Sequence, residues 1–97
     1  MVAIALTSRI DKAEALSLAR KLTSEIIDDI DKLYVDVSLK PHIGFEHSKI
    51  EFFDIENFGS LKADIAVVIG GDGSILRLLH YFREKNPPYI FSINMGR

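Results

Sequence analysis

The sequence has no cysteine, no long hydrophobic run and no excess of basic residues. Without cysteine the chain has neither a disulfide framework nor thiolate chemistry, which fits a reducing cytoplasm. The formal net charge of -2 gives no attraction for nucleic acid or for an anionic membrane. The apolar start, Val2 to Leu6, is far too short for a signal peptide or a membrane span. We therefore expect a soluble, cytoplasmic protein.

Length and composition are those of one small globular domain. With 97 residues, of which 47% are hydrophobic and 27% charged, the chain is close to the average soluble protein. A chain of this size buries roughly 60–70% of its unfolded surface, which is enough for one core.

Four segments have the pattern of β-strands. Val2 to Leu6 and Ile65 to Ile69 are continuous apolar runs, typical of strands buried on both faces of a sheet. Tyr89 to Ile93 is another apolar strand. Leu33 to Leu39 alternates aliphatic and more polar residues, which predicts a half-buried strand near a sheet edge.

Two segments have the periodicity of amphipathic helices. From about Asp11 to Asp31, apolar residues recur at i, i+3, i+4 and i+7, starting with Ala15. The same spacing runs from Ile75 to Phe82, and Asn86-Pro87-Pro88 ends that helix. Strands alternating with helices predict an α/β fold: an open, mostly parallel, Rossmann-like sheet with helices on both faces.

Residues 40–63 are the least readable part of the chain. Pro41 and Gly44 indicate a loop, Lys49 to Ile55 is either a short strand or an irregular connector, and Asn57 to Ser60 is a predicted turn. Two helices are thin cover for the four expected strands. Either this region contributes cover or the natural protein continues beyond residue 97, and we favour the second interpretation.

Two sets of side chains in this region raise the question of a ligand site or a contact surface. We expect no metal site at His42 and His47, because no third ligand follows in a recognisable pattern. Four phenylalanines predict either a satellite core or an exposed patch that packs on a missing domain: Phe45, Phe52, Phe53 and Phe58.

A glycine-rich stretch, Gly70-Gly71-Asp72-Gly73-Ser74, stands where the strand Ile65 to Ile69 gives way to a helix. Ligands of open parallel sheets bind beyond the carboxyl ends of the strands. Helix N-terminal amides favour phosphate there, and glycine lets other atoms approach the backbone closely. The stretch predicts a phosphate-binding turn, although neither GxxxxGK[ST] nor GxGxxG is present.

Asp72 does not fit a loop built only to hold phosphate, because a carboxylate repels phosphate. It fits if it accepts a proton from an attacking hydroxyl, or holds Mg²⁺ directly or through water. Both tasks belong to phosphoryl transfer. The alternative is that Asp72 or Ser74 caps the helix while Gly70 and Gly71 turn the chain.

Gly70-Gly71-Asp72-Gly73-Ser74 resembles the GGDG[TS] motif of NAD kinases, which diacylglycerol and sphingosine kinases and, more loosely, phosphofructokinases share. The segment from Pro88 to Arg97 is similar to the strand and N-x-G segment of NAD kinases. Lipid kinases usually have a strand leading to P-x-G-T-x-N, which does not occur in this sequence. The resemblance lies mostly in residues 70–97, since residues 1–69 agree only in their strand–helix order.

The resemblance implies a phosphofructokinase-like amino-terminal domain, residues 1–97, of a longer two-domain enzyme. Such an enzyme phosphorylates the adenosine-ribose 2′-hydroxyl of NAD using ATP or another donor, with a divalent metal such as Mg²⁺. A β-rich second domain supplies an Asn-Glu pair and much of the dinucleotide pocket, so we expect the 97 residues alone to be inactive. The implied partners are small-molecule nucleotides, and we expect the full-length protein to be a homo-oligomer.

Carried over by position, Asp72 would be the catalytic proton acceptor and Gly73 would lie against the dinucleotide. Arg77 matches a position that is often basic in the family and contacts the dinucleotide or its phosphates. The alternative is that Arg77 is simply solvated on the wet face of its helix.

The remaining residues of the motif would shape and support the nucleotide site. Gly70 and Gly71 would shape the loop, and Ser74 replaces the commoner threonine while keeping the hydroxyl. Asn94 and Gly96 match the N-x-G segment, where we expect a structural role.

Thr7 and Ser8 end the first strand at the same predicted sheet edge as Asp72. They either reach the phosphates of the donor or only end the strand. Two further hypotheses stand beside a NAD kinase domain: the corresponding half of a lipid kinase, and a non-catalytic flavodoxin-like binding or signalling module. A receiver domain would have acids where Thr7 and Ser8 stand.

Overall fold

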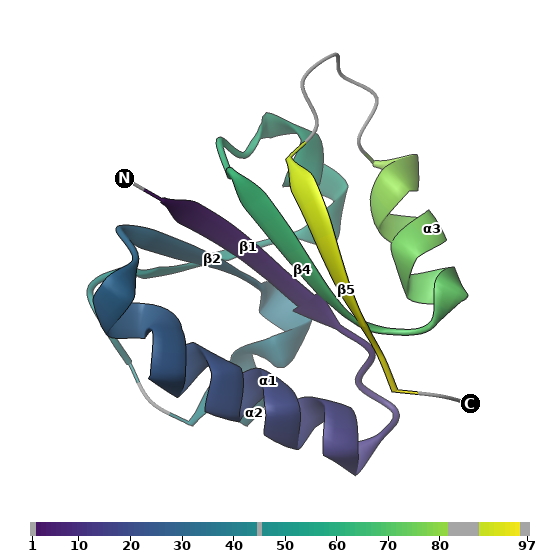
Figure 1. Ribbon diagram of the computed structural model, residues 1–97, viewed down its shortest axis with the longest axis horizontal. Helices are drawn as coiled ribbons and strands as arrows, with labels where there is room; N and C mark the ends of the chain where they lie inside the picture. The colour runs from purple at the N-terminus through teal and green to yellow at the C-terminus, as the bar shows by residue number, and fades with distance from the viewer. Residues whose placement is uncertain (1, 45, 82–87, 96–97) are drawn as a thin grey trace.

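The computed structural model describes residues 2–44, 46–81 and 88–95 (Figure 1). They form a five-stranded sheet in the order β3-β2-β1-β4-β5, and every neighbouring pair of strands is parallel. In chain order the strands are β1 (Ala3–Ser8), β2 (Lys32–Asp36), β3 (Ile50–Phe53), β4 (Ile65–Gly70) and β5 (Tyr89–Asn94). This open parallel sheet confirms the predicted α/β fold class, with one strand more than expected.

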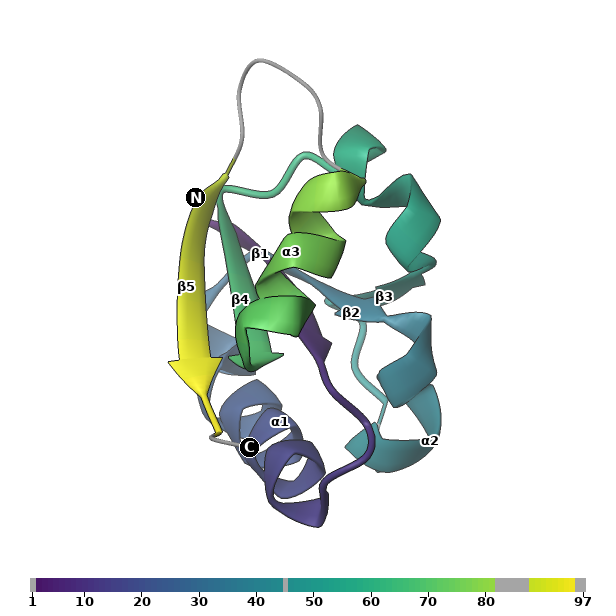
Figure 2. The same cartoon turned by 90° about the vertical axis from the view of Figure 1, so that its right-hand side faces the viewer.

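Helices cover both faces of the sheet (Figure 2). One face carries α1 (Ala13–Ile26), the 3-10 turns η1 (Ile27–Asp29) and η2 (Val37–Leu39), and the short α2 (Lys40–Ile43). The opposite face carries the 3-10 helix η3 (Ile55–Ser60) and α3 (Asp72–His80). Right-handed crossovers require this division, because the steps from β1 to β3 and from β3 back to β5 run in opposite directions across the sheet.

The two central strands, β1 and β4, are the continuous apolar runs of the sequence. Their alternate side chains enter two separate cores, as expected when successive strand residues point to opposite faces. Ile4, Leu6, Val67 and Ile69 join the core under α1, whereas Ala66 joins the core under α3. The second core also contains Ala5, Val68, Phe53, Ile55, Phe58 and Leu78.

Two predicted elements have different bounds in the structure. The helix expected as far as Asp31 ends at Ile26 and continues only as the turn η1. The strand expected over Leu33 to Leu39 is β2, which ends at Asp36 and lies next to the edge strand β3, in agreement with its expected place near a sheet edge.

The buried Asp36 carboxylate explains where β2 ends. Asp36 is 2% exposed, and its Oδ2 accepts a hydrogen bond from Thr7 Oγ1 at 2.7 Å. Its Oδ1 accepts from the backbone N–H of Ser38 at 3.1 Å, which caps the 3-10 turn η2. The side chain thus directs the backbone out of the sheet and into a turn.

Residues 40–63 cover part of the sheet, in agreement with the first of the two interpretations of the sequence. They supply the strand β3, the helix α2 and the helix η3, which contains the predicted turn at Asn57 to Ser60. Phe53 and Phe58 are buried with ring centroids 6.1 Å apart, and Phe52 packs against the core under α1. These three therefore form core, while Phe45 lies outside the described residues.

Candidate functional site

A cleft of about 330 Å³ opens at the carboxyl edge of the sheet, between the end of β1 and the start of α3. The edge is where ligands of open parallel sheets bind. Ten residues line the cleft: Thr7, Ser8, Arg9, Asp11, Ile55, Gly71, Gly73, Ser74, Arg77 and Leu78. The fold thus brings four residues of the predicted site into one cavity with the end of the first strand.

The glycine-rich turn places the amino end of α3 at this cleft. Gly71 is the N-cap residue, and its carbonyl accepts hydrogen bonds from the amides of Ser74 at 3.1 Å and Ile75 at 3.4 Å. No side-chain hydrogen bond caps the helix among the described residues, which does not support the capping alternative for Asp72 or Ser74. The first-turn amides and the helix dipole give this end of α3 a partial positive charge.

Glycine occupies the three positions of this turn for different structural reasons. Gly70 is buried with φ +155, and a Cβ there would overlap the Ser74 side chain and approach Arg9 Cβ. A Cβ at Gly71 or Gly73 would meet nothing within 4 Å. Packing therefore requires glycine at position 70, whereas the space beside Gly71 and Gly73 is open cleft.

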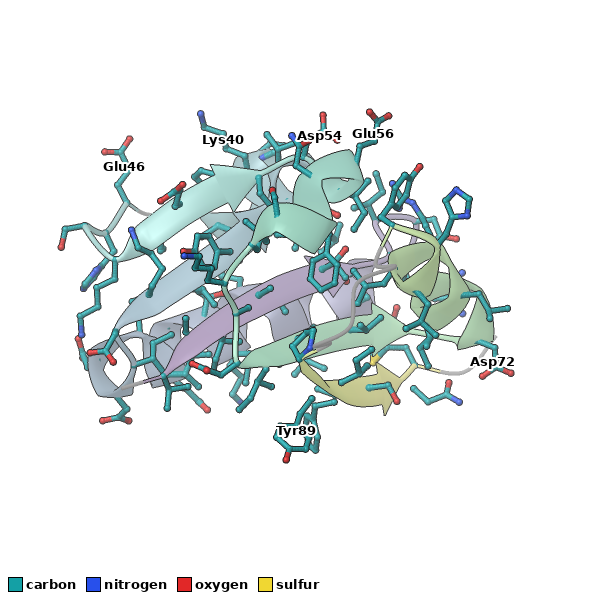
Figure 3. All side chains as sticks on the ribbon, turned by 90° about the horizontal axis from the view of Figure 1, so that it is seen from above. Lys40, Glu46, Asp54, Glu56, Asp72 and Tyr89 are labelled. Atoms are coloured by element: carbon teal, nitrogen blue, oxygen red, sulfur yellow. The ribbon has the colours of Figure 1, made fainter. Side chains whose placement is uncertain are left out.

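Asp72 lies at the rim of the cleft rather than on its wall. It is the first residue of α3, its side chain is exposed, and Figure 3 shows it pointing away from the body of the molecule. A carboxylate in the first turn interacts favourably with the helix dipole. Its position leaves it accessible to a ligand or to another part of the protein.

Two arginines line the cleft, and one of them is paired with a carboxylate. Arg77 extends from the second turn of α3, and its side chain is exposed. Arg9 follows β1, where its amide donates to the Ile69 carbonyl at 2.9 Å. Its guanidinium donates to both Asp11 carboxylate oxygens, at 2.6 and 2.7 Å.

The Arg9–Asp11 pair shifts the pKa of both groups. The hydrogen bond from Arg9 lowers the pKa of Asp11 to about 2, and the same bond raises the pKa of Arg9. Sequence reasoning missed both residues as parts of the cleft. The available signal was their position directly after an apolar strand, at the same sheet edge as the glycine-rich turn.

Thr7 and Ser8 line the cleft, but both hydroxyl groups donate their hydrogen bonds to other groups of the protein. Thr7 donates to Asp36, and Ser8 Oγ donates to the Arg9 carbonyl at 2.8 Å. These contacts favour the interpretation that they end the strand over the one in which they bind donor phosphates.

Asn94 lies beside the site but does not line the cleft. It pairs with Gly70 across β4 and β5, and the next amide, that of Met95, donates to the Gly70 carbonyl at 3.1 Å. This pairing fits the structural role expected of the N-x-G segment. Gly96 and Arg97 lie outside the described residues.

The part of the chain that the structure describes has neither a cluster of metal-ligating side chains nor a membrane-spanning helix. No three of its His, Asp or Glu side chains are grouped so that they could hold a metal ion. None of its helices has the length and hydrophobicity needed to cross a bilayer.

Fold and cleft together define a class: an open parallel α/β domain with a glycine-rich turn and the amino end of a helix at the carboxyl edge of its sheet. Within that class, the family model for the ATP-NAD kinase N-terminal domain matches residues 4–97. The chain belongs to the NAD kinase family, which confirms the resemblance found in its motifs. This match favours the first of the three hypotheses over a lipid kinase or a non-catalytic module.

Curated relatives support the same assignment. The chain is 34% identical over 96 residues to the NAD kinase of Methanothermobacter thermautotrophicus, an alignment that covers 99% of the chain and 32% of that relative. It is 38% identical over 89 residues to the NAD kinase of Thermococcus kodakarensis, covering 92% and 30%. For the NAD kinase of Pyrococcus abyssi the identity is 37% over 92 residues, covering 94% and 31%. The chain spans about a third of the length of these relatives.

Replacing Gly70 should destabilise the protein more than replacing Gly71. Gly70→Ala forces a side chain into a left-handed backbone conformation and against Ser74, which should cost about 1–3 kcal/mol of unfolding free energy. Gly71→Ala meets open space and should change it by less than about 0.5 kcal/mol. Urea denaturation measures both, and equal losses would contradict the distinction.

The Arg9–Asp11 pair should be visible in the titration of Asp11. Because the folded pKa is depressed to about 2, the pair stabilises the fold above the unfolded pKa of Asp and loses this effect as pH falls through about 2. Arg9→Gln should therefore raise the pKa of Asp11 toward about 3.9. Carboxyl NMR shifts measure it, with Arg20→Gln as the control, and an unchanged Asp11 pKa would contradict the pairing.

Proposed function

We propose that this chain is the amino-terminal, nucleotide-binding domain of a longer two-domain NAD kinase. The enzyme would transfer a phosphoryl group from ATP or another donor to the 2′-hydroxyl of the adenosine ribose of NAD. The family match over residues 4–97 supports this, as do the names of relatives about three times longer than the chain. The 97 residues alone would form part of the active site and would not catalyse the reaction.

The open space beside Gly71 and Gly73 is the observation that carries the proposal. Neither residue needs to be glycine for internal packing, yet both line the cleft at the amino end of α3. A site without side chains there lets a phosphate chain or a ribose contact the backbone closely. Arg77 adds positive charge to the same cavity, beside the Arg9–Asp11 pair, which suits a polyphosphate ligand.

Asp72 supplies the group that phosphoryl transfer to a hydroxyl requires. The 2′-oxygen would form a bond to the transferred phosphorus while the bond from phosphorus to the leaving oxygen breaks. The hydroxyl proton would pass to the Asp72 carboxylate. Because Asp72 is exposed at the rim, the rest of the enzyme would close over this edge and exclude water from the reacting groups.

A divalent metal such as Mg²⁺ fits this site as a companion of the donor phosphates. Mg²⁺ keeps several waters and binds through one or two carboxylates together with substrate phosphates. Among the described residues, Asp72 at the rim is the carboxylate that would hold such a metal, directly or through water. When bound, the metal would neutralise charge on the phosphoryl oxygens.

Removing the proton acceptor should abolish most of the activity without unfolding the protein. In the complete protein, Asp72→Asn should lower kcat for NADP formation by roughly 10²–10⁴-fold, because general-base catalysis contributes that much. Its thermal midpoint should fall by no more than about 4 °C, since the exposed side chain loses only its interaction with the helix dipole. Glu46→Gln, an exposed acid outside the cleft, is the control and should be fully active. Wild-type turnover in Asp72→Asn would refute the assigned role.

A side chain at position 73 should separate stability from binding. Gly73→Ala places a better helix former inside α3, so stability should rise by about 0.5–1 kcal/mol. The added methyl group enters the cleft, so KM for the nucleotide held there should rise by about tenfold, a loss of about 1.4 kcal/mol. Thermal melts and initial rates with NAD and with ATP varied in turn measure both effects. An unchanged KM for both nucleotides would place the ligand elsewhere.

A further inference from the structure

The backbone of Arg9 is tied to the end of β4. Its amide donates to the carbonyl of Ile69 at 2.9 Å, and its carbonyl accepts from Ser8 Oγ at 2.8 Å. Its Cβ lies 3.7 Å from the point where a Cβ at Gly70 would stand. The root of the Arg9 side chain is therefore fixed beside the glycine-rich turn.

The guanidinium of Arg9 is held by Asp11 along one edge only. Nε donates to Asp11 Oδ1 at 2.6 Å and Nη2 donates to Oδ2 at 2.7 Å, which makes a bidentate pair. An arginine head group has five N–H donors, of which this pair uses two and leaves three: two on Nη1 and one on Nη2. Among the described residues, no other group accepts from them. The Nη1–Nη2 edge can therefore take a second bidentate partner.

Asp11 would oppose phosphate binding if it stood in the cleft by itself. It lines the cavity together with Arg9, and a carboxylate repels a phosphate group. Both of its oxygens accept from Arg9, and the hydrogen bond lowers its pKa to about 2, so the carboxylate stays ionised and paired at neutral pH. The opposite edge of the guanidinium is then the part of the pair that suits an incoming anion.

The two walls of the cleft offer different groups to a phosphate. The amino end of α3 supplies backbone amides and Arg77 on one side. Arg9 follows β1 on the other side. A phosphate chain between these walls would accept hydrogen bonds from both, with an arginine fork opposite the helix amides.

Stabilisation of the fold gives a weaker explanation of the pair. The Arg9 side chain is 24% exposed and that of Asp11 65% exposed, and exposed ion pairs contribute little to stability. The two residues are also only two positions apart, so their contact joins no distant elements. An arginine that is already ordered loses less conformational freedom when a ligand binds. The arrangement therefore favours preparation for a ligand.

We infer that Asp11 is a positioning residue, which presents the Nη1–Nη2 edge of Arg9 to a phosphate group of the nucleotide in the cleft. This role rests on the proposed function and deepens it by naming a contact to the nucleotide. The phosphate belongs to the donor or to the diphosphate of NAD. Simple attraction predicts the opposite effect of Asp11, because a cavity without its negative charge would attract phosphate more strongly.

The sign of the change in KM tests this role in the complete protein. Asp11→Asn keeps the size of the side chain and removes one of the two acceptor oxygens. KM for one nucleotide should rise by about 3–10-fold with kcat nearly unchanged, because a ground-state contact is weakened. ATP and NAD are varied in turn, and the nucleotide whose KM rises is the one that contacts Arg9. A fall in KM, or no change for either nucleotide, would overturn the inference.

The control for this variant is Glu14→Gln. It makes the same change of charge at an exposed residue that does not line the cleft, so both KM values should stay at the wild-type level.

Arg9→Lys keeps the positive charge and removes the fork. KM for the same nucleotide should rise by about tenfold or more, and adding Asp11→Asn should raise it no further, since Asp11 acts through the guanidinium. Arg20→Lys, an exposed arginine outside the cleft, is the control. Tm should change by less than about 4 °C in each variant, which separates the role from a structural one. A lysine enzyme with wild-type KM would overturn the inference.

Inorganic pyrophosphate separates this inference from the proposed activity, since both nucleotides contain its phosphate linkage. Calorimetric titration of the complete protein should show binding that Asp11→Asn and Arg9→Lys each weaken. A protein that gives this result but forms no NADP would overturn only the activity. An active enzyme in which neither variant changes KM or pyrophosphate affinity would overturn only the role of the pair.

Discussion

The backbone of Gly70, packed against Ser74, fixes where β4 ends and where α3 begins. Its φ of +155 and the lack of room for a Cβ turn the chain sharply at a buried position. Its carbonyl also accepts the amide of Met95, which ties the end of β5 to the same point. The cleft, the direction of α3 and the exposed position of Asp72 all depend on this one turn.

The charges around that turn are arranged in two layers. Arg77 and the first amides of α3 make the inside of the cleft positive, while Arg9 is paired there with Asp11. Asp72 stands outside this positive wall with its carboxylate toward solvent. A ligand with its phosphates inside the cleft and a hydroxyl at the rim would complement both sets of charges. The proposed transfer needs the same arrangement, with phosphates inside and the accepting hydroxyl beside Asp72.

The sequence was sufficient for the features that depend on local pattern. Continuous apolar runs predict β1 and β4, because a strand buried on both faces needs apolar residues at every position. The glycines and Asp72 predict a ligand-binding turn, since their conformational and chemical properties are local as well. The motif also carried the resemblance that the family match confirmed.

Features that depend on contacts between distant residues could not be read in this way. Thr7 and Asp36 are 29 positions apart, and only the pairing of β1 with β2 brings the hydroxyl to the buried carboxylate. β2 lies inside the sheet because β3 pairs with it. β3 is short, and its residues have no clear hydrophobic periodicity that would predict a strand. Arg9 belongs to the cleft because β1 lies next to β4, a neighbour relation that no local pattern specifies.

The strand order has a consequence for how the protein emerges from the ribosome. β1 is the middle strand, and the Ala3 amide bonds to the Asp64 side chain, 61 positions later. At about 5–20 residues per second, translation leaves roughly 3–12 s in which one edge of β1 has no partner. During that interval β1, α1 and β2 can assemble as a right-handed unit, while the glycine turn has not yet been made. The nascent chain can therefore form one part of its sheet before the glycine-rich turn is made, with an open strand edge that is exposed to aggregation in the meantime.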